Sequence, residues 1–206
     1  MTVGAVRAKG IAFWSFLTSL ERLRGTDDRQ ATLAELPREI AQALRIGEVV
    51  ATGWYPIDWY RELHAAMNRA CRQEGFDLSQ RIGRDSALAD FRGIYRLLLR
   101  VVSSEMLVSQ APRLFRLYFQ GGDVAMAETG KGLGVVEFNG WDGFDRAMWS
   151  DVTGGIEGVL LARRAIHVRH RVLRGGGEEG HFKIEYRWSM SPNPVSSTIP
   201  PPGAKG

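Results

Sequence analysis

The sequence predicts an α+β fold in which an N-terminal block of helices packs on an antiparallel sheet made of two hairpins that flank a long helix. Up to Gly121-Gly122, apolar residues recur at three- and four-residue spacing, which is typical of amphipathic helices. After that pair, two stretches with strand-like composition precede a helical stretch, and two alternating stretches follow it. This order of elements is that of an α+β domain.

Length and composition are those of an ordinary globular protein. The 206 residues are 44% hydrophobic and 24% charged, which argues against global disorder. We expect a flexible N-terminus at 1–9, a single ligand-binding-like α+β domain at 10–188, and a disordered tail rich in Pro and Ser at 189–206. The lone Cys71 excludes an intramolecular disulfide.

The charge and hydropathy patterns bear on location and partners. The formal charge of +4 is spread along the chain, so nucleic acid is not an expected partner. No apolar run reaches the roughly 18 residues that a membrane span needs, and the N-terminus lacks the features of a secretory signal. Nearly all basic residues are Arg, which favours a bacterial source. We expect a cytoplasmic bacterial protein with no membrane span.

The first half is predicted to hold successive helices. One helix ends at Gly25, a second runs to Leu36, and a third begins at Pro37 and ends near Ile46, before Gly47. The chain then reads as an extended piece over Glu48–Thr52 and a turn over Gly53–Pro56. The later helices are expected at 57–71, at 78–90, at 93–102 as the most buried one, and from Ser103 or Ser104 onward, with Pro112 marking a kink or a late start.

The second half is predicted to form the sheet. Strands are expected at 124–128 and 133–138, joined by a glycine-rich turn, and at 166–172 and 182–188, with a helix over 144–164 between the pairs. That helix contains Gly154, Gly155 and Gly158, which predict that another backbone approaches it closely. The same glycine-bearing face is a possible contact for a homodimer.

Four aromatic residues near the start of one helix form the most informative cluster. Trp54, Tyr55, Trp59 and Tyr60 lie within seven residues, which exceeds what a helix start needs for its own burial. They can line a ligand pocket or a protein-binding surface, because Trp and Tyr offer a large contact area at low entropic cost. Alternatively, Tyr60 belongs to the core and Trp54 packs under the turn.

Polar residues on apolar faces are further candidates. His64 shares a helix face with Met67 and Cys71 and is either a haem or metal ligand or a hydrogen-bonded core residue.

Tyr95, Arg96 and Arg100 lie on the helix expected to be most buried. The two arginines can anchor an anionic ligand, or they can pair with Asp85 or Asp90.

Metal, phosphate and catalytic signatures are weak. His170 and His181 can approach across the last hairpin, but two histidines without a third ligand make a poor zinc site. The Gly130–Gly134 segment joins two strands and lacks the ending of a phosphate-binding loop. Since no nucleophile, base and acid occur in a recognised pattern, we expect that the protein is not an enzyme.

The order of the motifs resembles an uncharacterised protein family described mainly from myxobacteria, itself similar to the 4-vinyl reductase domain. The wider superfamily includes haem–nitric oxide binding domains and the Bet3-like subunits of transport tethering complexes. The resemblance spans about residues 10–188. The residues that carry it are Trp54, Tyr55, Pro56, Tyr60, Gly93, Tyr95, Arg96, Arg100, Pro112, Tyr118, Phe119 and Trp188.

The resemblance implies a fold that encloses an apolar pocket between the helices and the sheet. Relatives use such a pocket for haem, aromatic effectors or acyl chains. Vinyl reductase domains of the regulatory kind hold zinc with cysteines near the last hairpin, where this chain has His181 and no cysteine. Cys71 matches no acylation motif of the tethering subunits.

Three hypotheses about function follow from these residues. The first is a non-enzymatic regulatory or signalling module, without a cofactor, that binds a small apolar ligand or a protein partner. The second is a haem-based gas sensor that uses His64. The third is a scaffold that binds proteins and no small ligand.

Overall fold

The computed structural model describes residues 5–72, 75–93 and 109–190. The helix predicted at 93–102 therefore lies almost entirely outside the described residues, and of the helix predicted from Ser103 or Ser104 only the later part is described, where a short helix begins next to Pro112, as the predicted late start requires. Within the described ranges no helix is long and apolar enough to cross a bilayer.

Five helices make up the N-terminal block, close to the predicted positions. They are α1 (Gly10–Arg24), α2 (Thr26–Ala34), α3 (Arg38–Arg45), α4 (Ile57–Ala70) and α5 (Asp77–Arg92). Gly25 separates α1 from α2 with a φ of 96°, a conformation in which any side chain is strained. Pro56 precedes α4 directly, where its fixed φ suits a helix start.

A small sheet that the sequence does not predict ties this block together. Strand β1 (Arg7–Lys9) pairs with β2 (Trp54–Pro56) on one side and with β3 (Phe119–Gln120) on the other. The end of the expected flexible N-terminus and the expected turn over 53–56 are thus strands, whereas Glu48–Thr52 forms no strand. All three pairing segments are far apart in sequence, so local periodicity carries no signal for them.

The large sheet contains the two predicted pairs of strands. Its strands are β4 (Asp123–Gly130), β5 (Leu133–Asn139), β6 (Ala165–Gly175) and β7 (Phe182–Met190), all antiparallel in the order β4-β5-β7-β6. Along β7 the buried residues alternate with more exposed ones, and they are Phe182, Ile184, Tyr186 and Trp188. One face of the sheet is therefore apolar and packs on the helices.

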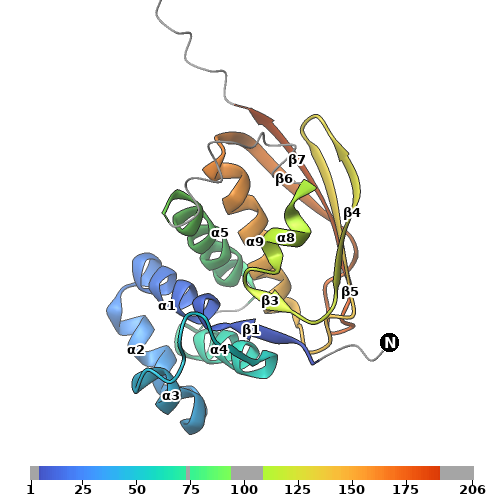
Figure 1. The fold of residues 1–206 in the computed structure, drawn as a ribbon. Coiled ribbons are helices and arrows are strands. Elements are labelled where there is room, and N and C mark those ends of the chain that lie inside the picture. Colours follow the sequence, from blue (N-terminus) through green and yellow to red (C-terminus); the bar gives the residue numbers. More distant parts are fainter. Residues whose placement is uncertain (1–4, 73–74, 94–108, 191–206) are drawn as a thin grey trace, which may run out of the picture.

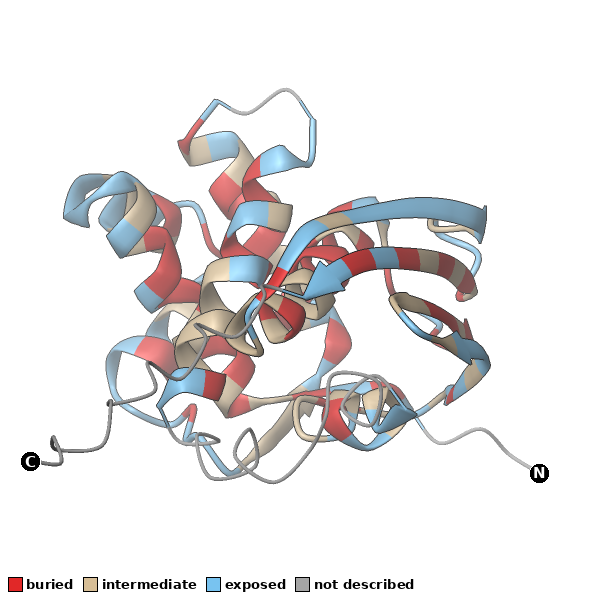
Figure 2. Cartoon of the chain, turned by 90° about the horizontal axis from the view of Figure 1, so that it is seen from above, coloured by how far each residue is buried: buried red, intermediate tan, exposed pale blue. Residues whose placement is uncertain are grey.

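Helices α8 (Ala111–Phe115) and α9 (Arg146–Ala162) lie against that face, and α5 lies on the far side of α9 from the sheet (Figure 1). The side chain of Asp145 caps α9 by accepting a hydrogen bond from the Met148 backbone N–H at 2.9 Å. Buried residues line the inner sides of the sheet and helices (Figure 2), and a single apolar core connects α1 with β7.

Helices α5 and α9 pack with their backbones in close contact. A Cβ atom at Gly154 would overlap the carbonyl oxygen of Gln80, and one at Gly158 would overlap that of Arg84. Gly83 on α5 approaches the Asp151 carbonyl in the same way. The predicted close approach of a backbone is confirmed, but the partner is α5 of the same chain. This glycine face is already covered and is not available as the homodimer contact we expected.

Candidate functional site

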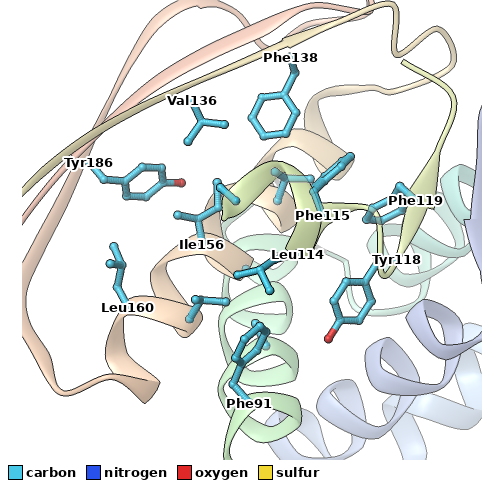
Figure 3. A pocket seen from close by; sticks show the side chains of 15 residues that line it. Phe91, Leu114, Phe115, Tyr118, Phe119, Val136, Phe138, Ile156, Leu160 and Tyr186 are labelled. Atoms are coloured by element: carbon cyan, nitrogen blue, oxygen red, sulfur yellow. The ribbon is translucent and has the colours of Figure 1, made fainter. Parts of the chain in front are cut away.

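An apolar cavity of about 110 Å³ lies between the helices and the large sheet. Side chains from α9 and α5 form its floor, α8 and β3 close one side, and β5 and β7 form the roof. Figure 3 shows Val136, Phe138 and Tyr186 projecting from the sheet toward Ile156 and Leu114 of the helices. The lining also includes Ala87, Phe91, Ala111, Phe115, Tyr118, Phe119, Val152, Gly155, Val159 and Leu160.

The local sequence explains why these side chains converge. Val136 and Phe138 alternate along β5, so both point to the helical side of the sheet. Val152, Ile156 and Val159 recur at four- and three-residue spacing on α9 and share one face of the helix. Gly155 lies on the same side, and a Cβ there would meet no atom closer than the Gly83 carbonyl oxygen at 4.0 Å. Absence of a side chain at Gly155 leaves room in the cavity.

Two tyrosines supply the polar atoms of the lining, and both are already engaged. The Tyr186 hydroxyl donates to the Thr153 carbonyl at 2.9 Å, and the Tyr118 hydroxyl donates to Asp90 at 2.9 Å. Burial raises the pKa of Tyr186 well above its usual value. The Tyr186 hydroxyl is therefore a neutral donor, and because both hydroxyls already have protein acceptors, the cavity offers a ligand an apolar surface.

The predicted aromatic cluster lies away from this cavity. Tyr55 stacks on Trp59 with ring centroids 5.8 Å apart, and its hydroxyl accepts from the Val50 N–H and donates to the Glu48 carbonyl. Trp54 lies under the ammonium group of Lys9. These contacts favour the structural interpretation, in which the aromatic residues fix the loop before α4.

Tyr60 and His64 belong to a buried polar network at the junction of α4, α5 and α9. The Tyr60 hydroxyl donates to Asp151 Oδ2 at 2.9 Å, and His64 Nδ1 lies 3.0 Å from the Ser79 hydroxyl. His64 is 0% exposed, and burial lowers its pKa to about 3, so the imidazole is neutral. His64 does not line the cavity and contacts the rings of Phe16 and Tyr60 instead.

The remaining predicted residues do not assemble a site among the described positions. Tyr95, Arg96 and Arg100 lie outside the described residues, and Asp90, one suggested partner of the arginines, accepts hydrogen bonds from Ser15 and Tyr118. His170 pairs in register with Tyr186, whereas His181 precedes β7, so the expected approach across the hairpin is wrong. In the described ranges no cluster of His, Cys, Asp and Glu suits a metal ion.

Comparison with solved structures gives the fold a clear counterpart, although no family model and no curated protein matches the sequence. An oxygen-binding H-NOX domain related to soluble guanylate cyclases matches with a TM-score of 0.64 at 13% identity, over 87% of this chain and 94% of that one. An iron(II) unliganded H-NOX mutant from K. algicida matches with a TM-score of 0.64 at 14% identity, over 88% and 96% of the two chains.

A third similar structure concerns haem directly. It was solved in work on haem redox potential and protein-induced porphyrin distortion, and it matches with a TM-score of 0.62 at 13% identity over 88% of this chain and 99% of that one. Our expectation of a module without a cofactor is therefore corrected, because haem is the group named for a neighbour that shares nearly the whole fold.

The described residues around the cavity do not fit haem as they stand. None of them is a His, Cys, Met, Lys or Arg, and both tyrosine hydroxyls donate to protein acceptors, so the lining provides neither an available iron ligand nor a cation for the propionates. All four histidines and Cys71 are described, and none lines the cavity. A volume of about 110 Å³ is also below the roughly 150 Å³ of a cavity that holds benzene.

What the comparisons show is the architecture. The described helices and antiparallel sheets of this chain match those of the H-NOX structures in overall arrangement, over most of both chains. The predicted likeness of fold to haem–nitric oxide binding domains is confirmed, whereas membership of their superfamily and a myxobacterial origin stay predictions. This chain has an α+β fold of the H-NOX type.

Proposed function

We propose that this chain is a ligand-binding sensor domain whose ligand occupies the apolar cavity beneath the large sheet. The observation that carries the proposal is the place of the cavity, at the junction of α5, α8, α9 and the sheet. A ligand held there touches both halves of the fold, so its binding can change how the halves pack. The function proposed is binding rather than catalysis, and a partner protein would detect the bound state.

Haem is the first ligand class to test, because solved structures of the same fold come from work on haem redox potential and haem distortion. Haem binding requires a wider cavity than the one described and an iron ligand other than His or Cys. The gas-sensor hypothesis that relies on His64 is not part of the proposal, since Phe16, Tyr60 and Ser79 surround that imidazole. An apolar ligand held without an iron–histidine bond is the form that the lining favours.

A comparison of two tetrapyrroles tests this directly. If haemin binds, we expect iron-free protoporphyrin IX to bind with a dissociation constant within about tenfold of it, because no His or Cys lines the cavity and a tenfold ratio is only about 1.4 kcal/mol. Titration followed by Soret absorbance and by tryptophan quenching measures both. His64→Gln is expected to leave the haemin spectrum unchanged.

Haemin binding more than about a hundredfold tighter than protoporphyrin IX, with a spectrum altered by His64→Gln, would contradict the placement of His64. If neither tetrapyrrole binds, haem is removed as the ligand, and the cavity remains a site for smaller apolar molecules.

A cavity-filling variant separates binding in the cavity from binding elsewhere. Ile156→Phe adds an aromatic ring at a lining position and is expected to weaken whichever tetrapyrrole binds by at least about tenfold, since added bulk in a packed interior is not readily accommodated. Ile46→Phe is the matched control, because Ile46 is 58% exposed and lies outside the lining. Equal affinities for the two variants would place the ligand somewhere else.

A further inference from the structure

Strand β6 lies at one edge of the large sheet and is exposed along most of its length. It pairs with β7 on one side, and no described strand pairs with its other side. Eight of its eleven residues are exposed, so both faces of the strand and its free edge meet solvent (Figure 2). In an edge strand, every second residue directs its N–H and C=O away from the sheet, where a further strand can pair with them.

The register with β7 assigns the side chains of β6 to the two faces of the sheet. Val172 lies opposite Ile184, which belongs to the buried core, so Val172 projects to the helical side. Arg169 and Arg171 differ from Val172 by an odd number of positions, with no bulge between them, and they therefore project to the outer face. Strand β6 thus carries apolar and cationic side chains on opposite faces.

The described helices leave the apolar side of β6 partly uncovered. Val172 is 50% exposed although it projects to the helical side, and Ile166 and Leu173 of the same strand are 36% and 41% exposed. Phe76, the residue before α5, is 37% exposed and borders the same hollow as Val172. Exposed apolar residues grouped in this way mark a surface that contacts another molecule.

The outer face of β6 carries a row of three exposed arginines, Arg169, Arg171 and Arg174. Arg171 lies 3.7 Å from Glu185, but Arg187 lies closer to the same carboxylate, at 3.0 Å. Arg169 and Arg174 form no ion pair with a carboxylate among the described residues. The row therefore has more positive charge than the sheet neutralises, and it attracts anionic groups.

Charge narrows the choice of the molecule that contacts this surface. A second copy of the chain, paired edge to edge, would bring two arginine rows together, and like charges opposite one another destabilise a strand pair. Residues 191–206 contain five Pro and no Asp or Glu, and residues 94–108 contain two Arg and one Glu, so neither segment complements the row. Charge complementarity therefore points to an acidic segment of another protein.

We propose that β6 binds an extended segment of a partner protein, which adds to the sheet as a further strand and alternates acidic with apolar residues. Side chains of an added strand fall on the two faces in turn, so its acids lie beside Arg169 and Arg171 and its apolar residues beside Val172. Main-chain hydrogen bonds supply the affinity in this mode of recognition, and alternate side chains supply the specificity. Register shifts on both sides of Arg169–Val172 confine the pairing to a short stretch. This binding is independent of the ligand of the cavity.

Two labelled peptides of the same composition test strand addition. One alternates Glu and Val over about eight residues, and the other carries the same residues as a block of Glu followed by a block of Val. We expect the alternating peptide to bind the full chain with a dissociation constant below about 1 mM, and the block peptide to bind at least about tenfold more weakly. Only the alternating peptide places all its acids on one face of a strand. Fluorescence anisotropy measures both.

Methylation of backbone nitrogens separates main-chain pairing from charge attraction. N-methylation of every Glu blocks the N–H groups on one edge of the alternating peptide, and N-methylation of every Val blocks those on the other edge, because the N–H direction alternates along a strand. We expect one methylated peptide to bind at least about tenfold more weakly than the parent and the other to bind as the parent does. Only the edge that faces β6 needs its N–H groups.

Paired variants locate the binding on β6. Arg169→Glu should weaken the alternating peptide at least about tenfold, whereas Arg38→Glu, which makes the same change of charge at an exposed arginine of α3, should leave its binding unchanged. Val172→Thr keeps the branched shape and should weaken the peptide about fourfold, the factor for one methyl group withdrawn from apolar contact. Val50→Thr is its control, because Val50 is 51% exposed and lies outside β6.

Four peptide results would overturn the proposal. They are equal binding of the alternating and block peptides, binding of both methylated peptides as tight as that of the parent, no effect of Arg169→Glu, and no binding up to about 1 mM. Two further results would assign the surface to another molecule. Vesicles of phosphatidylserine and phosphatidylcholine that bind wild type but not Arg169→Glu, in place of the peptide, would indicate a lipid surface. A wild-type dimer that the alternating peptide dissociates would indicate a second copy of the chain.

Discussion

Replacing Gly154 with Ala is expected to lower the free energy of unfolding by about 3 kcal/mol, at the upper end of what overpacking usually costs. The new Cβ would overlap the backbone carbonyl oxygen of Gln80 and would lie 2.9 Å from the Arg84 backbone nitrogen. Backbone atoms cannot rotate away as a flexible side chain can, so α5 and α9 must separate. The gain of about 1 kcal/mol in helix propensity does not offset that separation.

Gly155→Ala is the matched control for this prediction. It makes the same chemical change one residue along α9, where the nearest atom to the new Cβ is 4.0 Å away. We expect it to raise the free energy of unfolding by about 0.5–1 kcal/mol through helix propensity alone. Urea unfolding followed by far-ultraviolet circular dichroism measures both variants. Equal destabilisation by the two would show that the α5–α9 contact is not as close as described.

The second large effect is a pH dependence that originates at Asp151. Its carboxyl group is buried, and burial raises its pKa from 3.8 to about 7, although the hydrogen bond from Tyr60 opposes the shift. The native state therefore holds this proton more tightly than the unfolded chain does. The corresponding stability is fully present below about pH 4 and is lost as the pH rises through about 7.

Asp151→Asn should remove this dependence while keeping an acceptor for the Tyr60 hydroxyl. A shift of about three pKa units corresponds to about 4 kcal/mol, so the variant should match wild type near about pH 4 and exceed it by up to that amount near about pH 8.5. Urea unfolding of both proteins across this range measures the difference in the free energy of unfolding.

The titration of His64 also contributes to the pH dependence of stability, but at a different pH. Its pKa falls from 6.5 in the unfolded chain to about 3 in the native state, so its contribution to stability is present above about pH 6.5 and is lost as the pH falls through about 3. His64 Nε2 lies 3.9 Å from Asp151 Oδ2, so the two proteins are compared only above about pH 4, where burial keeps the native imidazole neutral. Asp142→Asn, at an exposed carboxylate, is the control. A difference between wild type and Asp151→Asn that stays constant with pH would contradict the burial of an uncharged Asp151.

For several side chains that line the cavity, the direction could be predicted from the sequence because these residues recur with the period of a helix or of a strand. The spacing of Val152, Ile156 and Val159 places them on one helix face, and alternation places Ile184 and Tyr186 on one face of a strand. In the structure Val152, Ile156, Val159 and Tyr186 line the cavity. That a void remains between them was not predictable, because periodicity says which side chains face the interior and not whether they fill it.

The aromatic cluster was conspicuous in the sequence but does not line the cavity. Trp54, Tyr55 and Trp59 stand out in the sequence by their density, but the structure uses them to fix β2 and the loop before α4.

By itself, the sequence determined the class of the fold, because each helix and each strand of the large sheet carries its own pattern of apolar residues. It also determined that a backbone would approach Gly154 and Gly158 closely. Only the tertiary structure decided which backbone that is, which buried groups lose their contact with water, and where the interior stays open. Those properties depend on distances between residues remote in sequence, and no local pattern encodes them.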